Sequence, residues 1–182
     1  MLIGYTNNAQ HIYAVEADPV NNHILNINCK LNFIESKPTI INRCIYAKSN
    51  EILSFEKCLA GSDSSTKSLG GDKKVLSSTL LDIIEQNKID IDNVSLLKID
   101  IEGSELFLIR DLVKLSKHKD LIILLSLHPK YWHKIPAKPE ALKILLEYYD
   151  FYNEDEELIE EESFDSYTTS KNCLVVLKPK KL

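Results

Sequence analysis

Short apolar runs alternate with segments of helical periodicity along most of this chain. Such alternation is typical of a parallel β-sheet whose strands are joined by crossover helices. We therefore predict an α/β protein with a mostly parallel sheet and a single domain over residues 1–182. The runs expected to form strands are residues 11–15, 39–45, 51–58, 95–101, 121–127 and 172–177.

The first predicted helix follows Asp18, which can cap it, and has Pro19 at its first position, a favoured place for proline. Apolar residues then recur at helical spacing, which predicts one buried stripe along this helix. The stripe consists of Val20, Ile24, Ile27 and Leu31.

Three further helices are expected: one over residues 79–87, one capped by Ser104 and one that begins at Pro139. The periodicity predicts a buried face for two of these helices. In the helix capped by Ser104 the predicted buried residues are Leu106, Ile109, Leu112 and Val113, and in the helix that begins at Pro139 they are Leu142, Leu145, Leu146 and Tyr149.

The remaining segments differ in polarity. Residues 95–101 and the very apolar 121–127 are predicted central strands, whereas 51–58 alternates like an edge strand. The small, polar segment 60–74 is expected to be a loop, and the acidic segment 153–165 a solvated turn and helix flank.

Composition narrows the class of protein. With 44% hydrophobic and 27% charged residues, a chain of 182 residues is typical of a globular domain. A net charge of -5 argues against binding to nucleic acid. No apolar run reaches transmembrane length and no signal peptide is evident, so a cytoplasmic protein without membrane contact is expected. The scattered cysteines, Cys29, Cys44, Cys58 and Cys173, predict reduced, buried thiols.

Polar residues follow three of the predicted strands. Glu16 follows the first, residues 100–103 follow another, and Ser126 and His128 lie at the end of the most apolar one. In open parallel sheets, ligands bind beyond the carboxyl ends of the strands. We therefore expect a binding crevice at this edge.

Each candidate has more than one interpretation. Glu16 could accept the ribose hydroxyls of a nucleotide, or it could be a surface carboxylate beside a helix start. His128 is the natural general base because the pKa of histidine ordinarily lies near neutrality, with Asp100 as the alternative base. The His128 ring could equally bond the backbone beside Pro129.

Four stretches, in this order, resemble the motifs of FkbM-type S-adenosylmethionine-dependent methyltransferases: IYAVEADPVN, INRCIY, LLKIDIEGSE and LIILLSLHP. The family patterns are a strand with EPDP, a strand with NxA, a strand with KIDxEGxE and a strand with ExHP. The resemblance extends from about Ile3 to Pro179, and KIDIEGSE is its most specific part. It implies a Rossmann-like class I methyltransferase fold with helices on both faces of the sheet.

The resemblance also implies an activity, namely transfer of a methyl group from S-adenosylmethionine to a hydroxyl of a saccharide or other small molecule. Glu16 would hold the cofactor ribose, Cys44 and Ile45 would lie along the adenine, and Asp100 would lie where cofactor and acceptor meet. Glu102 and His128 would lie near the acceptor, and Gly103 would allow a tight turn.

Two aromatic residues follow His128 in the sequence. Tyr131 and Trp132 could line the acceptor pocket, as aromatic faces do for sugars, or they could cover the end of the sheet.

The sequence departs from the family pattern in two places. Ser126 stands where ExHP has its acid, so any role of that acid is lost or reassigned. Gly4 lies in a remnant of the glycine-rich loop that binds the methionine end of the cofactor, and we expect the first strand and first helix to be missing. A missing central strand would leave residues 95–101 or a neighbour with an unpaired edge, through which the chain could form a homo-oligomer.

Other functions are also compatible with an α/β domain of this kind. The chain could be a non-catalytic methyltransferase-like module that acts through protein–protein pairing, whereas a glycosyltransferase-type domain is disfavoured because no DxD signature is present. His128 and His133 could bind a metal ion with Asp100 or Glu102, but their spacing is not helical, and we expect no metal.

Overall fold

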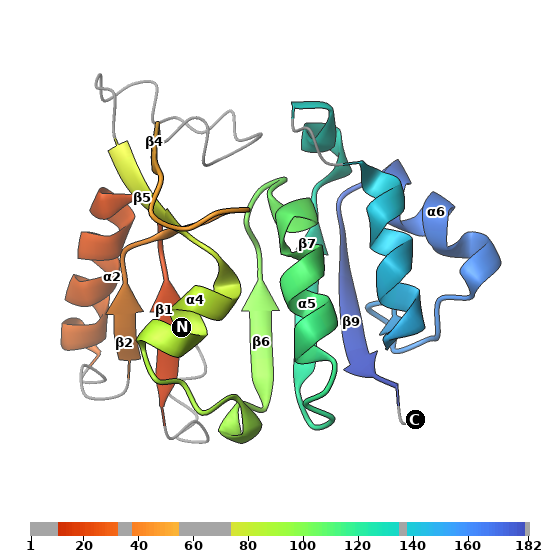
Figure 1. The fold of residues 1–182 in the computed structure, drawn as a ribbon, viewed down its shortest axis with the longest axis horizontal. Helices are drawn as coiled ribbons and strands as arrows, with labels where there is room; N and C mark the ends of the chain where they lie inside the picture. Colours follow the sequence, from red (N-terminus) through yellow and green to blue (C-terminus); the bar gives the residue numbers. More distant parts are fainter. Residues whose placement is uncertain (1–10, 33–37, 55–73, 135–137, 181–182) are drawn as a thin grey trace.

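The computed structural model describes residues 11–32, 38–54, 74–134 and 138–180, in which strands form three sheets. The first sheet pairs β1 (Ile12–Val15) with β2 (Pro38–Ile41). The second has the order β3 (Cys44–Ile45), β5 (Lys74–Ser78), β4 (Ile52–Ser54), and the third has the order β6 (Leu96–Ile99), β7 (Ile122–Leu127), β9 (Cys173–Pro179), β8 (Tyr149–Tyr152). The strands β1, β2 and β6 point the same way in Figure 1.

The α/β class is confirmed, but the sheets are mixed rather than mostly parallel. The pairs β1–β2, β3–β5 and β6–β7 are parallel, whereas β4–β5, β7–β9 and β8–β9 are antiparallel. An apolar run has the same pattern in either direction, so the sequence could not reveal that β9 runs against β7.

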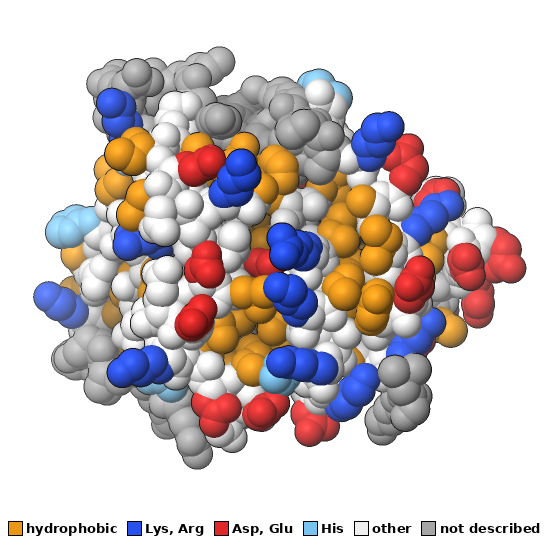
Figure 2. Space-filling model, viewed as in Figure 1, with side chains coloured by type: hydrophobic (Ala, Val, Ile, Leu, Met, Phe, Trp, Pro, Cys, Tyr) orange, Lys and Arg blue, Asp and Glu red, His pale blue; other side chains and the backbone are white. Residues whose placement is uncertain are grey.

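The helices are α2 (Pro19–Leu31), α4 (Leu80–Gln86), α5 (Ile109–Leu115) and α6 (Glu161–Ser170). The described residues also form the 3₁₀ helices η2 (Ile91–Asn93), η3 (Glu105–Leu108), η4 (Pro129–Lys134) and η5 (Pro139–Glu147). Acidic side chains gather over α6 at the right of Figure 2, which agrees with the predicted solvated flank. Within the described ranges, no helix has both the length and the apolar character needed to cross a membrane.

The main hydrophobic core lies around β7, which pairs with strands on both sides as predicted. Ile123, Leu125 and Leu127 alternate on its fully buried face. Helix α5 contributes Leu112 to the same core, as the periodicity predicted, and Leu115, which was not predicted, whereas the predicted Val113 is only partly buried. Further core members come from η5, β8, β9 and α6, namely Leu142, Leu145, Tyr149, Phe151, Phe164, Val175 and Leu177.

Helix α2 confirms its predicted ends but not its predicted burial. The Asp18 carboxylate accepts a hydrogen bond from the Val20 amide at 2.8 Å, and Pro19 occupies the first turn. The exposed fractions of the stripe residues nevertheless lie between 42% and 70%; these are Val20, Ile24, Ile27 and Leu31. The only buried residue of α2 is Cys29, so the prediction of a buried stripe is wrong for this chain.

Several boundaries also need correction. The predicted strand 39–45 is two strands, because the Asn42 side chain between them donates to the carbonyls of Glu16 and Ala17 at 2.8 and 3.1 Å. The Ser104 side chain makes no capping hydrogen bond, and a 3₁₀ turn precedes α5. Strands β5 and β8 were not predicted, and β8 includes Tyr149, which was expected in a helix. The predicted edge strand β4 is confirmed over residues 52–54.

Strand β6 was predicted to be central, with an unpaired edge expected there or at a neighbour if a central strand were missing. In the described part of the chain it pairs only with β7, so it forms the edge of its sheet, in agreement with the second expectation. Its residue Leu96 is exposed, as expected of an unpaired edge.

Candidate functional site

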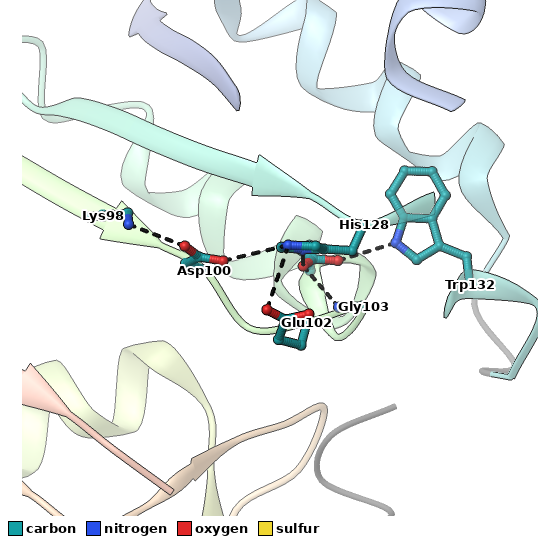
Figure 3. A network of polar contacts seen from close by, with 7 residues as sticks. Lys98, Asp100, Glu102, Gly103, His128 and Trp132 are labelled. Carbon is teal, nitrogen blue, oxygen red and sulfur yellow. Dashed lines mark hydrogen bonds and ion pairs between the residues drawn. The ribbon is translucent and has the colours of Figure 1, made fainter. Parts of the chain in front are cut away.

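The candidate site lies at the carboxyl ends of β6 and β7 (Figure 3). These strands pair in parallel register, with Ile99 opposite Leu125, so the residues that follow them emerge at the same edge of the sheet. Asp100 directly follows β6, and His128 directly follows β7. The predicted convergence of the two strand-end motifs is therefore present.

The buried carboxylate of Glu105 connects three residues at this edge of the sheet through hydrogen bonds. Its Oε1 lies 2.6 Å from Nδ1 of His128 and accepts the Gly103 amide at 2.9 Å. Its Oε2 accepts the indole N–H of Trp132 at 3.1 Å. The Glu105 side chain is 0% exposed, so these partners replace the water that a buried carboxylate would otherwise need.

The chain enters this network through a tight turn. Glu102 and Gly103 both have positive φ, 52° and 100°. A Cβ at Gly103 would lie 2.6 Å from the Cβ of Tyr131, which is closer than two carbon atoms can approach. Glycine is therefore required here both by backbone conformation and by space, as the sequence predicted.

The second ring nitrogen of His128, Nε2, points toward two carboxylates. It lies 3.6 Å from Oδ1 of Asp100 and 3.9 Å from Oε1 of Glu102, longer than a hydrogen bond. The second oxygen of Asp100 contacts Lys98 Nζ at 3.1 Å. Both carboxylate side chains are partly exposed, whereas the His128 side chain is only 10% exposed. The ring therefore directs Nε2 from a buried position toward two partly exposed carboxylates.

The pKa of His128 is raised above its ordinary value. The first cause is the hydrogen bond to Glu105, and the charges of Glu105, Glu102 and Asp100 act in the same direction against the effect of burial. With Nδ1 bonded to Glu105, Nε2 is the nitrogen that can take up or release a proton at the crevice.

The sequence analysis assigned no role to Glu105, which is the acid that orients His128. Ser126 replaces the acid of the family pattern within β7, and the acid that contacts the imidazole comes instead from the last position of KIDIEGSE. A signal was available, because Glu105 lies in a turn whose neighbours Leu106 and Leu108 are apolar and buried. An acid among such residues needs a partner.

Glu16 follows β1 as predicted, and its backbone amide donates to the carbonyl of Ile41 at 3.0 Å. Its Oε1 accepts the Asp18 amide at 2.7 Å, which fixes the direction of the carboxylate. Within the described part of the chain, the second oxygen of Glu16 accepts no hydrogen bond. The hydrogen-bond partner of the Glu16 carboxylate is thus Asp18, in the loop that leads into α2.

The other predicted residues fall into three groups. Cys44 is fully buried and disulfide-bonded, which corrects the prediction of a reduced thiol, while Cys29 and Cys173 hold no disulfide. Ile45 is partly buried against the main core. Gly4 lies outside the described residues.

The aromatic residues beside the site are both buried. Trp132 donates to Glu105, and the ring of Tyr131 stacks near His128 with centroids 6.3 Å apart. These contacts agree with the interpretation that they cover the end of the sheet. His133, the other histidine considered for a metal, is exposed and does not join the group of Asp100, Glu102 and His128.

Comparison with solved structures supports the fold. The chain is similar to the crystal structure of methyltransferase FkbM from Methylobacillus flagellatus KT, with a TM-score of 0.56 and 17% sequence identity. The match covers 97% of this chain but 39% of that chain, so the present chain spans well under half the length of that protein. Curated proteins gave no match to the sequence.

The family assignment comes from the sequence itself. The methyltransferase FkbM domain matches residues 2–164, which is most of the chain and includes both β1 with Glu16 and the strand-end residues of β6 and β7. The chain therefore belongs to the methyltransferase FkbM domain family.

Proposed function

We propose that this chain is an S-adenosylmethionine-dependent methyltransferase that methylates a hydroxyl of a saccharide or other small molecule. The observation that carries the proposal is the buried His128–Glu105 pair, whose second imidazole nitrogen points toward the partly exposed Asp100 at the ends of β6 and β7. Membership of the methyltransferase FkbM domain family supports the same reaction class.

His128 acts as the general base in this proposal. Its Nε2 takes the proton of the acceptor hydroxyl, and the Glu105 carboxylate stabilises the resulting imidazolium through Nδ1 at 2.6 Å. Asp100 and Glu102 lie on the far side of Nε2 and favour the charged ring. S-adenosylmethionine, when bound, supplies a methyl group whose bond to sulfur breaks as the acceptor oxygen attacks.

Glu16 is the residue that would hold the ribose of the cofactor. Its Oε1 is occupied by the Asp18 amide at 2.7 Å, and its second oxygen can accept a ribose hydroxyl. Charge-assisted hydrogen bonds contribute about 1.5–3 kcal/mol each, whereas micromolar binding takes about 8 kcal/mol. Glu16 therefore contributes to affinity but needs further contacts. Because the Cys44 side chain is buried and disulfide-bonded, only its backbone could line the adenine.

Calorimetric titration with S-adenosylmethionine and S-adenosylhomocysteine tests cofactor binding. We expect binding by the unaltered chain and about 10-fold weaker binding by Glu16→Gln, which keeps an oxygen for the Asp18 amide but loses the charge. Glu85→Gln, an exposed acid in α4, is the matched control and should bind normally. Absence of binding at millimolar cofactor would refute the proposal for this chain.

The catalytic role is tested separately with labelled methyl donor and a panel of saccharide and small-molecule hydroxyls. We expect His128→Asn to lose transfer while keeping cofactor affinity, because the proposal assigns the ring to the acceptor hydroxyl and not to the cofactor. Equal activity of the variant would exclude His128 as the base.

A second candidate function is protein–protein pairing by a non-catalytic module. It is favoured by the exposed stripe on α2 and by the edge of β6, which has no strand partner among the described residues. Sedimentation analysis distinguishes the two: a stable homo-oligomer that dissociates in an Ile24→Glu variant supports pairing. A monomer that binds the cofactor contradicts it.

A further inference from the structure

Asp100, Glu102 and His128 each direct one ligand atom to a common point beyond β6 and β7. The three atoms all lie within 4.8 Å of one another, and Figure 3 shows the side chains converging from two strand ends. From this geometry we propose that the three residues bind a divalent transition-metal ion. The expectation of no metal, which rested on sequence spacing and on His133, is thereby revised.

The strongest support comes from His128 rather than from the acids. Its side chain is 90% buried, yet Nε2 is aimed into the group at 3.6 and 3.9 Å from the carboxylate oxygens, with no hydrogen bond in the described part of the chain. Metal-binding histidines characteristically bond a carboxylate through their other nitrogen, which fixes the tautomer. Glu105 occupies that position at Nδ1.

The distances suit a metal after small movements. Metal bonds to imidazole and carboxylate are about 2.0–2.2 Å, which places neighbouring ligand atoms about 3.0–3.5 Å apart. The gaps of 3.6 and 3.9 Å at Nε2 therefore need to close by a few tenths of an ångström. The carboxylate oxygens of Asp100 and Glu102 must also approach each other, because separations within the group extend up to 4.8 Å. Asp100 and Glu102 can make this adjustment because their side chains are 41% and 43% exposed.

The ligand set indicates which metals fit. Two carboxylates with one imidazole suit ions such as Mn²⁺, Fe²⁺ or Zn²⁺, and three ligands on one side leave positions open for water or an acceptor oxygen. Lys98 competes with such an ion, because its ammonium lies 3.1 Å from Oδ2 of Asp100. Removal of that positive charge should therefore strengthen metal binding.

The catalytic meaning of the metal rests on the proposed function. A cation at this point would bind the acceptor hydroxyl and lower its pKa, so that the hydroxyl releases its proton to water. A His128 nitrogen that binds a metal cannot also take that proton. Metal binding and direct base catalysis by His128 are thus alternatives for the same atom.

The test is titration of the full chain with Mn²⁺ alone, followed by electron paramagnetic resonance. We expect one Mn²⁺ per chain, with at least 10-fold weaker binding for Asp100→Asn and Glu102→Gln. Lys98→Gln should bind several-fold more tightly. Spin-echo modulation from an imidazole nitrogen should be present and should disappear in His128→Gln.

The chain contains a matched control. Asp92 pairs with His118 in a second acid–histidine contact that lacks further ligands, so Asp92→Asn should leave Mn²⁺ binding unchanged. No Mn²⁺ binding at millimolar concentration, or equal loss in Asp92→Asn and Asp100→Asn, would overturn the inference. Because Asp100 and Glu102 are partly exposed, their variants should fold even if His128→Gln does not.

Cofactor titration without metal separates the two proposals. If S-adenosylhomocysteine binds and Mn²⁺ does not, the metal site is wrong while the methyltransferase proposal stands. If Mn²⁺ binds with the expected variant pattern and neither cofactor form binds, the proposed function fails and the metal site stands.

Discussion

The two halves of this chain have similar apolar patterns, but the apolar residues are mostly buried in the C-terminal half and largely exposed in β1 and α2 of the N-terminal half. In the C-terminal half, taken here as residues 80–180, one cluster contains most of the buried hydrophobic residues, from Leu80 to Leu177. Among the described residues of the N-terminal half, the buried members of the corresponding cluster are Cys44, Leu53 and Val75. The large apolar residues of β1 and α2 are instead exposed, namely Tyr13, Val15, Val20, Ile24, Ile27 and Leu31.

This contrast shows that the position of an apolar side can be predicted from sequence, whereas the burial of that side cannot. Periodicity predicts which side of a helix or strand is apolar, but it does not say what covers that side. Helix α5 lies over β7 and is covered by η5, whereas α2 packs mainly against β2. The C-terminal half should therefore carry most of the stability, together with the polar network around Glu105.

The largest expected difference between the halves is the response to apolar truncation. Leu125→Ala removes a fully buried residue of β7 and should lower the free energy of unfolding by about 3–5 kcal/mol. Ile24→Ala, in the exposed stripe, should change it by less than about 0.5 kcal/mol. Urea denaturation measures both. An equal cost at Ile24 would mean that the stripe is covered in solution, as protein pairing requires.

A slightly smaller effect is expected from Glu105, which joins the core to the site. Glu105→Ala leaves the donors of Gly103 and Trp132 without their acceptor and should cost about 3 kcal/mol. The chain has a single tryptophan, so Trp132 fluorescence reports this network directly.

Glu105→Gln is the milder control. The amide oxygen can still accept from His128 and Gly103, but its nitrogen meets the Trp132 N–H as a second donor. We expect an intermediate loss of stability. Fluorescence and stability unchanged in both variants would contradict the organising role of Glu105.

Sequence reasoning was most successful where local rules determine the structure. The Asp18 cap and the turn at Gly103 each follow from one residue type and its immediate neighbours. The meeting of Asp100 and His128 was predicted because parallel strands end at the same edge.

Apart from the Ser104 cap, which is a local error, the main failures involve contacts between segments far apart in the sequence. The sequence could not show that Asn42 divides one predicted strand by bonding back to the end of β1, nor that β9 runs antiparallel to β7. Glu105 was overlooked because its role depends on His128 and Trp132, more than twenty residues away. The site was thus located from sequence, whereas its internal support was not.

Helix caps offer a finer test of the same contrast. Asp18→Ala and Thr79→Ala each remove one side-chain acceptor from a helix start and should cost that helix about 1 kcal/mol. Because α4 contributes Leu80 to the main core, Thr79→Ala should lower global stability. Asp18→Ala should mainly speed local amide exchange in α2. Hydrogen exchange distinguishes these outcomes, and a global effect of Asp18→Ala would argue that α2 unfolds with the core.

The smallest expected effect is a dependence on pH at the start of α4. Asp111 from α5 accepts the amides of Leu80 and Leu81 at 3.0 and 3.3 Å, and its burial raises the pKa above 3.8. The folded state therefore binds this proton more tightly than the unfolded state, and the stability so gained at acid pH is lost as pH rises through the raised pKa. Asp82 has the opposite sign, because hydrogen bonds from Ser49 and Thr79 lower its pKa, so its contribution is present above 3.8 and lost as pH falls.

Asp111→Asn and Asp82→Asn isolate these two contributions, since each keeps an oxygen acceptor but no longer titrates. In urea denaturation at steps of pH, the stability of the unaltered chain relative to Asp111→Asn should fall with rising pH just above 3.8. Relative to Asp82→Asn, it should fall with decreasing pH below 3.8. Asp111 tests a contact inside the C-terminal half, whereas Asp82 tests a contact to Ser49 in the N-terminal half. The same sign for both carboxylates would show that burial does not control Asp111 and that the two halves do not differ here.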